Sequence, residues 1–192
     1  MNPFGWASLG VLVLYLDTGV PRVTRPQGAG MKRYSFIPVA SFAAFALALD
    51  QTTKAVMLGV MQPPRLIPVT PFFNLTLGFN EGASFGMLGG LMQGRLWAMI
   101  TLTGLIIALI GVWALRAKSG SERVGLSLIF GGALGNIIDR IRQGAVTDFL
   151  DFYWKDWHWP TFNMADVAIF IGAMLILSTA LHRKRKTETS HG

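Results

Sequence analysis

The sequence contains no cysteine, and this absence excludes disulfide bonds, cysteine nucleophiles and cysteine-ligated metal centres. It has only three histidines, and the spacing of His158, His182 and His191 does not fit a helical zinc motif. Charge is also scarce, because 14% of the 192 residues are charged, against about 25% in an average soluble domain. Since 52% of the residues are hydrophobic, the composition predicts a polytopic membrane protein with a single membrane domain.

The formal net charge of +7 raises the possibility of a nucleic-acid partner, but the placement of the charge argues against it. Lysines and arginines lie at the ends of apolar segments, as in the positive-inside pattern of membrane proteins. No nucleic-acid-binding motif accompanies them. The residues in question are Lys32, Arg33, Arg116, Lys118, Arg123, Arg183, Lys184, Arg185 and Lys186. We therefore expect no nucleic-acid partner.

Four apolar segments predict four transmembrane helices, at about residues 34–61, 96–115, 124–141 and 161–181. The first segment reaches spanning length only if residues 50–54 join the helix. Asp50 and Lys54 would then lie one turn apart and could form an ion pair, which lowers the cost of placing both near lipid. That pair has two interpretations, a helix-end ion pair without substrate contact or a part of a catalytic site.

Residues 1–30 differ from the rest of the chain. Residues 4–16 are apolar but too short to cross a bilayer, and a linker-like stretch follows them. We expect a poorly ordered N-terminal extension without a role in the chemistry; the alternative is a peripheral anchor formed by residues 4–16. The membrane domain is then residues 31–186, and residues 187–192 form a polar tail.

Residues 73–80 alternate apolar with small or polar side chains, which predicts a β-strand. Because a strand cannot lie open in hydrocarbon, we expect it at the membrane interface, paired with another strand. Residues 146–150 read as a second short extended piece. Three tryptophans, Trp154, Trp157 and Trp159, follow it and are typical of the interface belt.

The membrane topology brings the uncommon polar residues together. Nine lysines and arginines lie near one predicted side, and six lie near the other: Lys54, Arg65, Arg95, Arg140, Arg142 and Lys155. This bias places both termini in the cytoplasm. Every unusual polar side chain then falls at the outer leaflet: Asp50, Lys54, Asn80, Asn136, Asp139, Arg140, Asp148, Asn163 and Asp166.

Such a cluster offers carboxylates, amides and an arginine. If Asp148 and Asp166 lie close together in a low dielectric, both cannot ionise, so the pair supplies a general acid and a general base. Asn136 and Asn163 could fix the pair or bind a peptide backbone. The neighbouring Arg140 could stabilise charge or orient the Asp139 carboxylate, which belongs to the same cluster.

Simpler interpretations remain open for both acids. Asp148 could bind backbone amides at the end of a strand, and Asp166 could be a helix N-terminal acid favoured by the macrodipole. A proton-coupled transporter also uses membrane carboxylates, although it usually places them near the midplane and shows internal repeats. A metal-dependent phospholipid enzyme and a structural adaptor are further alternatives.

Five blocks of sequence resemble the lipoprotein signal peptidase (signal peptidase II) family over residues 31–186. In order they are Asp50-x-x-x-Lys54; Asn80-x-Gly82-Ala83-x-Phe85-Gly86; Gly132-Ala133-x-Gly135-Asn136-x-x-Asp139-Arg140; Val146-x-Asp148-Phe149; and Phe162-Asn163-x-Ala165-Asp166. The first block alone is a weak signal, whereas the last three together in a four-span protein are specific. The chain departs from the family pattern in its N-terminal extension.

The resemblance implies a bacterial inner-membrane aspartic endopeptidase, without metal or cofactor, that cleaves diacylglyceryl-prolipoproteins just before the lipidated cysteine. It implies four membrane helices with a small extracytoplasmic β-sheet cradle, membrane lipid as surroundings and a monomer. The catalytic pair would be Asp148 and Asp166. The substrate-binding residues would be Asn80, Gly82, Asn136, Arg140 and Asn163, and the supporting residues would be Asp50, Lys54 and Asp139.

Overall fold

The computed structural model describes residues 36–82 and 96–188. The chain divides into two compact units, Met1–Arg33 and Tyr34–Gly192, and the described residues all belong to the second. The expected N-terminal extension, the glycine-rich loop at residues 83–95 and the end of the polar tail lie outside the described residues. Within them the fold combines long helices with a small sheet, as the sequence predicts.

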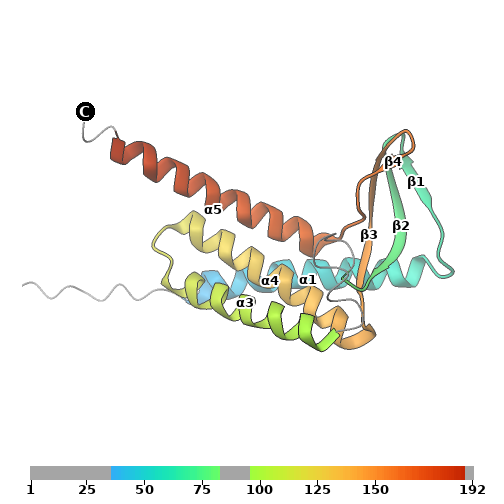
Figure 1. Ribbon diagram of the computed structural model, residues 1–192, viewed down its shortest axis with the longest axis horizontal. Coiled ribbons are helices and arrows are strands. Elements are labelled where there is room, and N and C mark those ends of the chain that lie inside the picture. The colour runs from blue at the N-terminus through green and yellow to red at the C-terminus, as the bar shows by residue number, and fades with distance from the viewer. Residues whose placement is uncertain (1–35, 83–95, 189–192) are drawn as a thin grey trace, which may run out of the picture. The chain divides into compact units, whose positions relative to one another are not determined.

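Helix α4 is the centre of the helical part. The helices are α1 (Phe36–Val60), α3 (Leu96–Arg116), α4 (Gly120–Gln143) and α5 (Met164–Glu188). α4 packs against each of the other three (Figure 1). By length and composition α3, α4 and residues Met164–Arg183 of α5 can cross a membrane. α1 has 25 residues and takes in residues 50–54 as one continuous helix, as the sequence predicts.

Glycines let the backbones of these helices approach one another closely. A side chain at Gly131 of α4 would meet the backbone of Ala43 in α1. At Gly132, on the neighbouring side of α4, it would meet the backbone of Ala165 in α5. Because small residues let membrane helices pack at short range, α4 holds α1 and the first turn of α5 beside each other.

α4 begins four residues earlier than the sequence pattern indicates. Ser119 is its N-cap, and the Ser119 hydroxyl accepts a hydrogen bond from the backbone N–H of Glu122 at 3.2 Å. This cap extends the helix into the short basic loop. The other end is as expected: Gly144, with φ of 81°, closes the helix, and its N–H donates to the Arg140 carbonyl at 3.0 Å.

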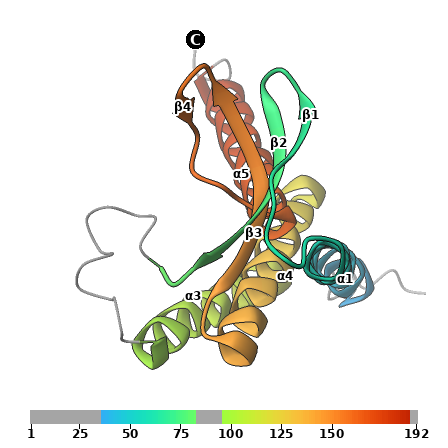
Figure 2. The same ribbon diagram turned by 90° about the vertical axis from the view of Figure 1, so that its right-hand side faces the viewer.

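The strands form one antiparallel sheet in the order β1-β2-β3-β4 (Figure 2). They are β1 (Ile67–Thr70), β2 (Phe73–Asn80), β3 (Val146–Trp154) and β4 (Trp157–His158). β2 coincides with the predicted strand, and β3 runs four residues beyond the predicted 146–150. The sequence pattern did not indicate β1 or β4, because strands of four and two residues depend on their neighbours rather than on local pattern.

The sheet is joined to the helices at one end of the bundle. A small core fixes this joint and consists of Met57 from α1, Met61 directly after that helix and Phe149 from β3. The register between β2 and β3 sets Gly78 opposite Asp148. Phe149 points into the core, so its neighbour Asp148 is held at the junction between sheet and helices.

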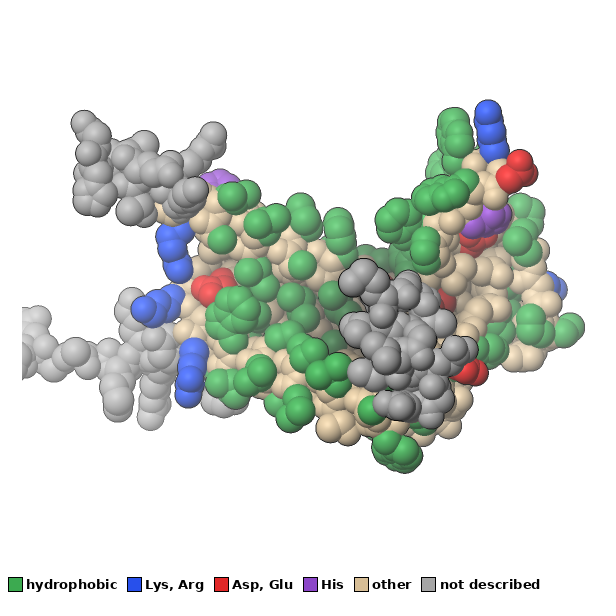
Figure 3. All heavy atoms as spheres, viewed as in Figure 1, with side chains coloured by type: hydrophobic (Ala, Val, Ile, Leu, Met, Phe, Trp, Pro, Cys, Tyr) green, Lys and Arg blue, Asp and Glu red, His purple; other side chains and the backbone are tan. Residues whose placement is uncertain are grey.

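Apolar side chains cover the outward sides of the helices. Leu109 of α3 is 71% exposed and Phe170 of α5 is 67% exposed. Figure 3 shows hydrophobic side chains spread over the visible helices, several basic ones at the end away from the sheet and another at the tip of the sheet. Because a helix exposed to water would not present such an apolar surface, these sides suit contact with lipid.

Candidate active site

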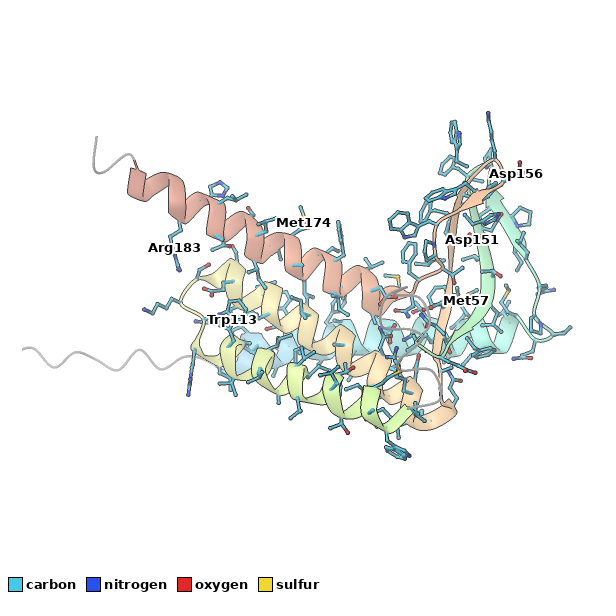
Figure 4. The ribbon with its side chains drawn as sticks, in the orientation of Figure 1. Met57, Trp113, Asp151, Asp156, Met174 and Arg183 are labelled. Atoms are coloured by element: carbon cyan, nitrogen blue, oxygen red, sulfur yellow. The ribbon has the colours of Figure 1, made fainter. Side chains whose placement is uncertain are left out.

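The uncommon polar residues meet where the helices join the sheet. Figure 4 shows Met57 and Asp151 at this end of the molecule and Trp113 and Arg183 at the other end of the helices. Hydrogen bonds and ion pairs connect residues of α1, α4, β2, β3 and the start of α5: Asp50, Lys54, Asn80, Gly82, Asn136, Asp139, Arg140, Asp148, Asn163 and Asp166. The structure therefore brings together every residue that the sequence assigned to the site.

The first turn of α5 holds Asp166 in a reciprocal cap. The Asp166 backbone N–H donates to Asn163 Oδ1 at 3.1 Å, and the Asn163 backbone N–H donates to Asp166 Oδ2 at 3.2 Å. This is the capping-box arrangement, with an asparagine at the N-cap and an aspartate at the third helical position. The backbone N–H of Ala165 donates to Asp50 Oδ1 at 2.9 Å. The helix start is thus satisfied by side chains, and it fixes Asp166 in place.

Asp148 is buried in β3, with 2% of its surface exposed. The Asn80 side-chain amide donates to its Oδ2 at 3.1 Å, and the Asn163 amide donates to its Oδ1 at 2.6 Å. Burial raises the pKa of the Asp148 carboxyl to about 6; the two amide bonds oppose that rise, and the nearby charge of Asp166 adds to it. Asp148 is therefore a carboxyl that holds its proton far more readily than an ordinary aspartate.

Asn163 contacts both carboxylates at once. Its side-chain amide binds Asp148, and its backbone N–H binds Asp166. One residue at the N-cap of α5 thus joins an acid from a strand to an acid from a helix. Two carboxyl groups arranged in this way, one of them with a raised pKa, can act as a general acid and a general base.

Each of three asparagines has its amide orientation fixed by a group that can only donate. The backbone N–H of Gly82 donates to Asn80 Oδ1 at 2.8 Å. The Asp166 N–H does the same for Asn163, and the Lys54 ammonium donates to Asn136 Oδ1 at 2.8 Å. Because each carbonyl oxygen is occupied, each NH₂ group faces a carboxylate of Asp148 or Asp166.

A buried ionic network lies beneath these amides. The Lys54 ammonium contacts Asp50 Oδ2 at 2.9 Å, which is the predicted ion pair, and Asp139 Oδ2 at 2.8 Å. Asp139 also accepts from the Thr147 backbone N–H at 3.1 Å and from Gln51 Nε2 at 3.0 Å. The sequence did not point to Gln51; its only signal was its place beside Asp50 in a helix that buries polar residues.

Arg140 reaches the same site but is weakly engaged. Its Nη1 donates to the Asn136 carbonyl at a long 3.4 Å, and its buried Nε has no hydrogen-bond partner in the part of the chain that the structure describes. Across residues 36–82 and 96–188 its guanidinium is in no ion pair, so Lys54, Gln51 and Thr147 orient Asp139 instead. The guanidinium lies within electrostatic range of Asp148 and Asp166 and retains donors for another molecule.

Gly82 is the last described residue before the glycine-rich loop. Its φ of 101° is a left-handed conformation that side chains rarely adopt, so a glycine is needed to turn the chain after Asn80. The remainder of that sequence block, Ala83 to Gly86, lies outside the described residues. Among the residues that are described, no three His, Asp or Glu side chains form a group that could hold a metal ion.

A second buried carboxylate, which the sequence did not single out, lies three residues along β3. Asp151 accepts from Asn74 Nδ2 at 3.1 Å and contacts His158 Nδ1 at 2.8 Å. These side chains come from β2, β3 and β4, so the cluster ties neighbouring strands together. Within residues 36–82 and 96–188 it has no hydrogen bond to Asp148 or Asp166, so it belongs to the sheet rather than to the site.

Comparison with known proteins gives one consistent result. The model of a family described as signal peptidase (SPase) II matches residues 42–182. The chain is 40% identical over 169 residues to a lipoprotein signal peptidase of Cupriavidus necator, covering 86% of this chain and 96% of that protein. It is 41% identical over 167 residues to a lipoprotein signal peptidase of Polynucleobacter necessarius, covering 84% of this chain and all of that protein.

Solved structures agree with the sequence relatives. A bacterial membrane enzyme matches with a TM-score of 0.69 at 31% identity, covering 79% of this chain and 92% of that one. A second structure of a bacterial membrane enzyme matches with a TM-score of 0.67, also at 31% identity, over 78% and 96% of the two chains. The fold of helices with a small sheet is therefore shared with membrane enzymes.

Proposed function

Because this chain belongs to the signal peptidase II family of peptidases, we propose that it removes signal peptides from diacylglyceryl-modified prolipoproteins with Asp148 and Asp166 as its catalytic pair. The single observation that carries this proposal is the position of Asn163, which binds both carboxylates from the N-cap of α5. The cut falls just before the lipidated cysteine.

The pair works with one proton between its two carboxyl groups. The ionised carboxylate takes a proton from water while the water oxygen attacks the scissile carbonyl carbon, and the protonated carboxyl gives its proton to the carbonyl oxygen. In the collapse of the resulting gem-diol, the first acid protonates the leaving nitrogen, the C–N bond breaks, and a hydroxyl proton returns to the second. The pair thus ends with the proton arrangement it began with.

The surrounding groups have distinct tasks. Asn80, Asn136 and Asn163 donate to the two carboxylates and fix their positions. Arg140, with unused donors beside the pair, binds a backbone carbonyl of the substrate and stabilises charge that develops on it. Gly82 lets the chain pass close to the bound peptide.

The location of the site suits a substrate that stays in the bilayer. Asp166 lies at the third position of α5, and Arg140 lies in the last turn of α4, so the pair sits at the ends of helices rather than at their midpoint. A proton-coupled transporter would usually place such groups near the midplane. We propose that this end faces the outer leaflet of the bacterial inner membrane, with both termini in the cytoplasm.

Cleavage of a lipidated prolipoprotein by the purified full chain in detergent or liposomes tests the proposal. Asp148→Asn and Asp166→Asn should each reduce turnover by at least about 100-fold, because each removes a general acid or base. Asp151→Asn is the matched control, since it neutralises a buried carboxylate of the same strand outside the site. It should keep at least about half of wild-type turnover. Normal processing by either active-site variant would refute the pair.

Two further arms separate the alternatives. A chelator should leave turnover unchanged, because the steps above use only carboxyl groups and water; full loss of activity would favour a metal-dependent enzyme. An otherwise identical precursor without its diacylglyceryl group should be cut at least about tenfold more slowly, since the lipid holds the substrate at the interface. Equal rates on the two precursors would contradict the proposed substrate class.

A further inference from the structure

Lys54 makes more contacts than its charge requires. Its side chain is buried in α1, and its ammonium lies 2.9 Å from Asp50 Oδ2 and 2.8 Å from Asp139 Oδ2. Those two carboxylates already compensate a single buried positive charge. The third N–H points instead at a neutral group, Asn136 Oδ1, at 2.8 Å. All three donors of the ammonium are therefore used: two bind carboxylates, and the third binds the neutral amide of Asn136.

This third contact decides which way the Asn136 amide faces. An ammonium has no lone pair, so the atom of Asn136 opposite Lys54 must be the oxygen. The NH₂ group then faces away and donates to Asp166 Oδ1 at 3.1 Å. Without Lys54, the Asn163 amide, at 3.3 Å, would be the one donor among the described residues that holds this orientation. A reversed amide would set its carbonyl oxygen against the Asp166 carboxylate, with two acceptors facing each other.

The two acids consequently differ in how well their charged forms are stabilised. Asp166 accepts from the Asn136 amide and from the Asn163 backbone N–H, and it lies in the first turn of α5, where the helix dipole favours an anion. Asp148 accepts from two amides but lies in a strand without a helix terminus of its own. Burial raises its pKa to about 6.

The other charged groups around Asp166 do not reverse this difference, in which the ionised form of Asp166 is stabilised better than that of Asp148. Arg140 of α4 is attracted to both carboxylates, and to Asp148 more strongly than to Asp166. Asp50 of α1 and Asp139 of α4 are both bound to Lys54, whose single positive charge offsets one of their two negative charges. The difference between the two acids therefore depends on the amide and helix contacts of Asp166.

We propose that Lys54 is a positioning residue for the catalytic pair: by fixing the orientation of Asn136, it keeps Asp166 as the ionised member that takes the proton from water, while Asp148 carries the proton given to the carbonyl oxygen. The inference rests on the proposed function, in which these two acids cleave the peptide. Lys54 positions Asp166 through its contact with Asn136, and its charge also acts directly on Asp148.

A charge-balanced comparison isolates this role. Lys54→Met alone would strand two buried carboxylates and could prevent folding. Lys54→Met/Asp139→Asn removes one charge of each sign, and Asp139→Asn alone is its matched control, because it keeps Lys54 and the Asn136 contact. Both variants are assayed as full chains in detergent against a lipidated prolipoprotein, and kcat and KM are measured across the pH range.

The acid limb of the kcat/KM profile reports protonation of the base. In Asp139→Asn we expect this limb to stay within about half a pH unit of wild type. In the double variant we expect it about one unit higher, with kcat lowered about 10- to 100-fold and KM changed by less than about threefold. Coincident profiles for the two variants would overturn the inference.

A second variant keeps the test open if the double variant does not fold. Asn136→Asp keeps an oxygen for Lys54 and leaves its ion pairs in place, but it cannot donate to Asp166. Its acid limb should move upward by at least about one unit, and an unmoved limb would contradict the role of the amide. If Asp148→Asn or Asp166→Asn still turns over normally, the proposed function itself fails; if only the Lys54 comparison fails, the pair stands without this positioning residue.

Discussion

At the scale of single residues, the site depends on how weakly the surroundings of Asp148 stabilise its ionised form. It is buried in β3, its side-chain hydrogen-bond donors among the described residues are two neutral amides, and the charge of Asp166 is close by. These surroundings favour the protonated carboxyl and raise its pKa to about 6. A carboxyl with such a pKa can release and regain a proton near neutral pH, which general acid catalysis requires.

The raised pKa of Asp148 has a consequence for stability. The folded chain binds this proton more tightly than the unfolded chain, whose aspartate has its ordinary pKa of 3.8. The stabilising contribution is therefore complete below the ordinary value and is lost as pH rises through about 6. Asp148→Asn lacks this dependence. The difference in unfolding free energy between variant and wild type should therefore shift in favour of the variant by about 1–2 kcal/mol as the pH rises from about 5 to about 8.

Thermal unfolding of both proteins in detergent at the two pH values measures this change. The comparison uses the difference between variant and wild type, so that groups titrating in both cancel. Asp151→Asn provides the control for loss of a buried carboxylate in the same strand. A difference that is the same at both pH values, or that moves in the opposite direction, would contradict the raised pKa.

At the scale of elements, the helices could be predicted because their signals are local. Runs of apolar residues gave α3 to within one residue and the start of α5 to within three, although α5 continues seven residues beyond the predicted end. The length needed to span a bilayer gave the continuation of α1 through residues 50–54. The start of α4 was placed too late because the apolar pattern begins after the Ser119 cap. β2 was predicted with its bounds from alternation, whereas β1 and β4 are too short to carry a pattern.

The site was predictable only in part. Topology placed the polar residues at one leaflet, and the structure brings them together at one end of the helices. The amide orientations of Asn80, Asn136 and Asn163 could not be predicted, because each is set by a donor distant in sequence or on the backbone. The Asp151–His158 pair was missed for the same reason, since it exists only once β3 and β4 are paired.

The close approach of α1 and α4 gives a prediction at this scale. Gly131→Ala would push a methyl group into the backbone of Ala43, so it should destabilise the folded chain by about 1–3 kcal/mol. Gly104→Ala in α3 is the matched control, because a side chain there meets open space, and it should be neutral or slightly stabilising. Thermal unfolding in detergent measures both; equal effects would show that close packing at Gly131 is not required.

At the scale of the whole molecule, the described unit has two unlike ends. The sheet and the polar site lie at one end of the helices (Figure 1). Arg183 of α5 lies toward the other end (Figure 4), and Arg116 lies in the last turn of α3. Apolar side chains cover the helices between them. This polarity supports the proposed positive-inside orientation, with the site at the outer face of the bilayer.

The absence of native cysteine makes that orientation directly measurable. Asp156→Cys places a thiol on the exposed β3–β4 turn, and Lys118→Cys places one in the exposed α3–α4 loop. In spheroplasts, a membrane-impermeant maleimide should label the first variant at once. The second should react only after the membrane is permeabilised. Labelling in the reverse order would contradict the proposed topology, and wild type is the unlabelled control.

The central claim, that Asp148 and Asp166 act as one unit, is tested most directly by a kinetic double-mutant cycle. Turnover of a lipidated prolipoprotein is measured for Asp148→Asn, Asp166→Asn and the chain carrying both substitutions. Because residues that act together lose their effect together, the double variant should be no slower than the slower single variant, within about threefold. If the two losses instead multiply, or if either single variant keeps wild-type turnover, the two acids do not form a catalytic pair.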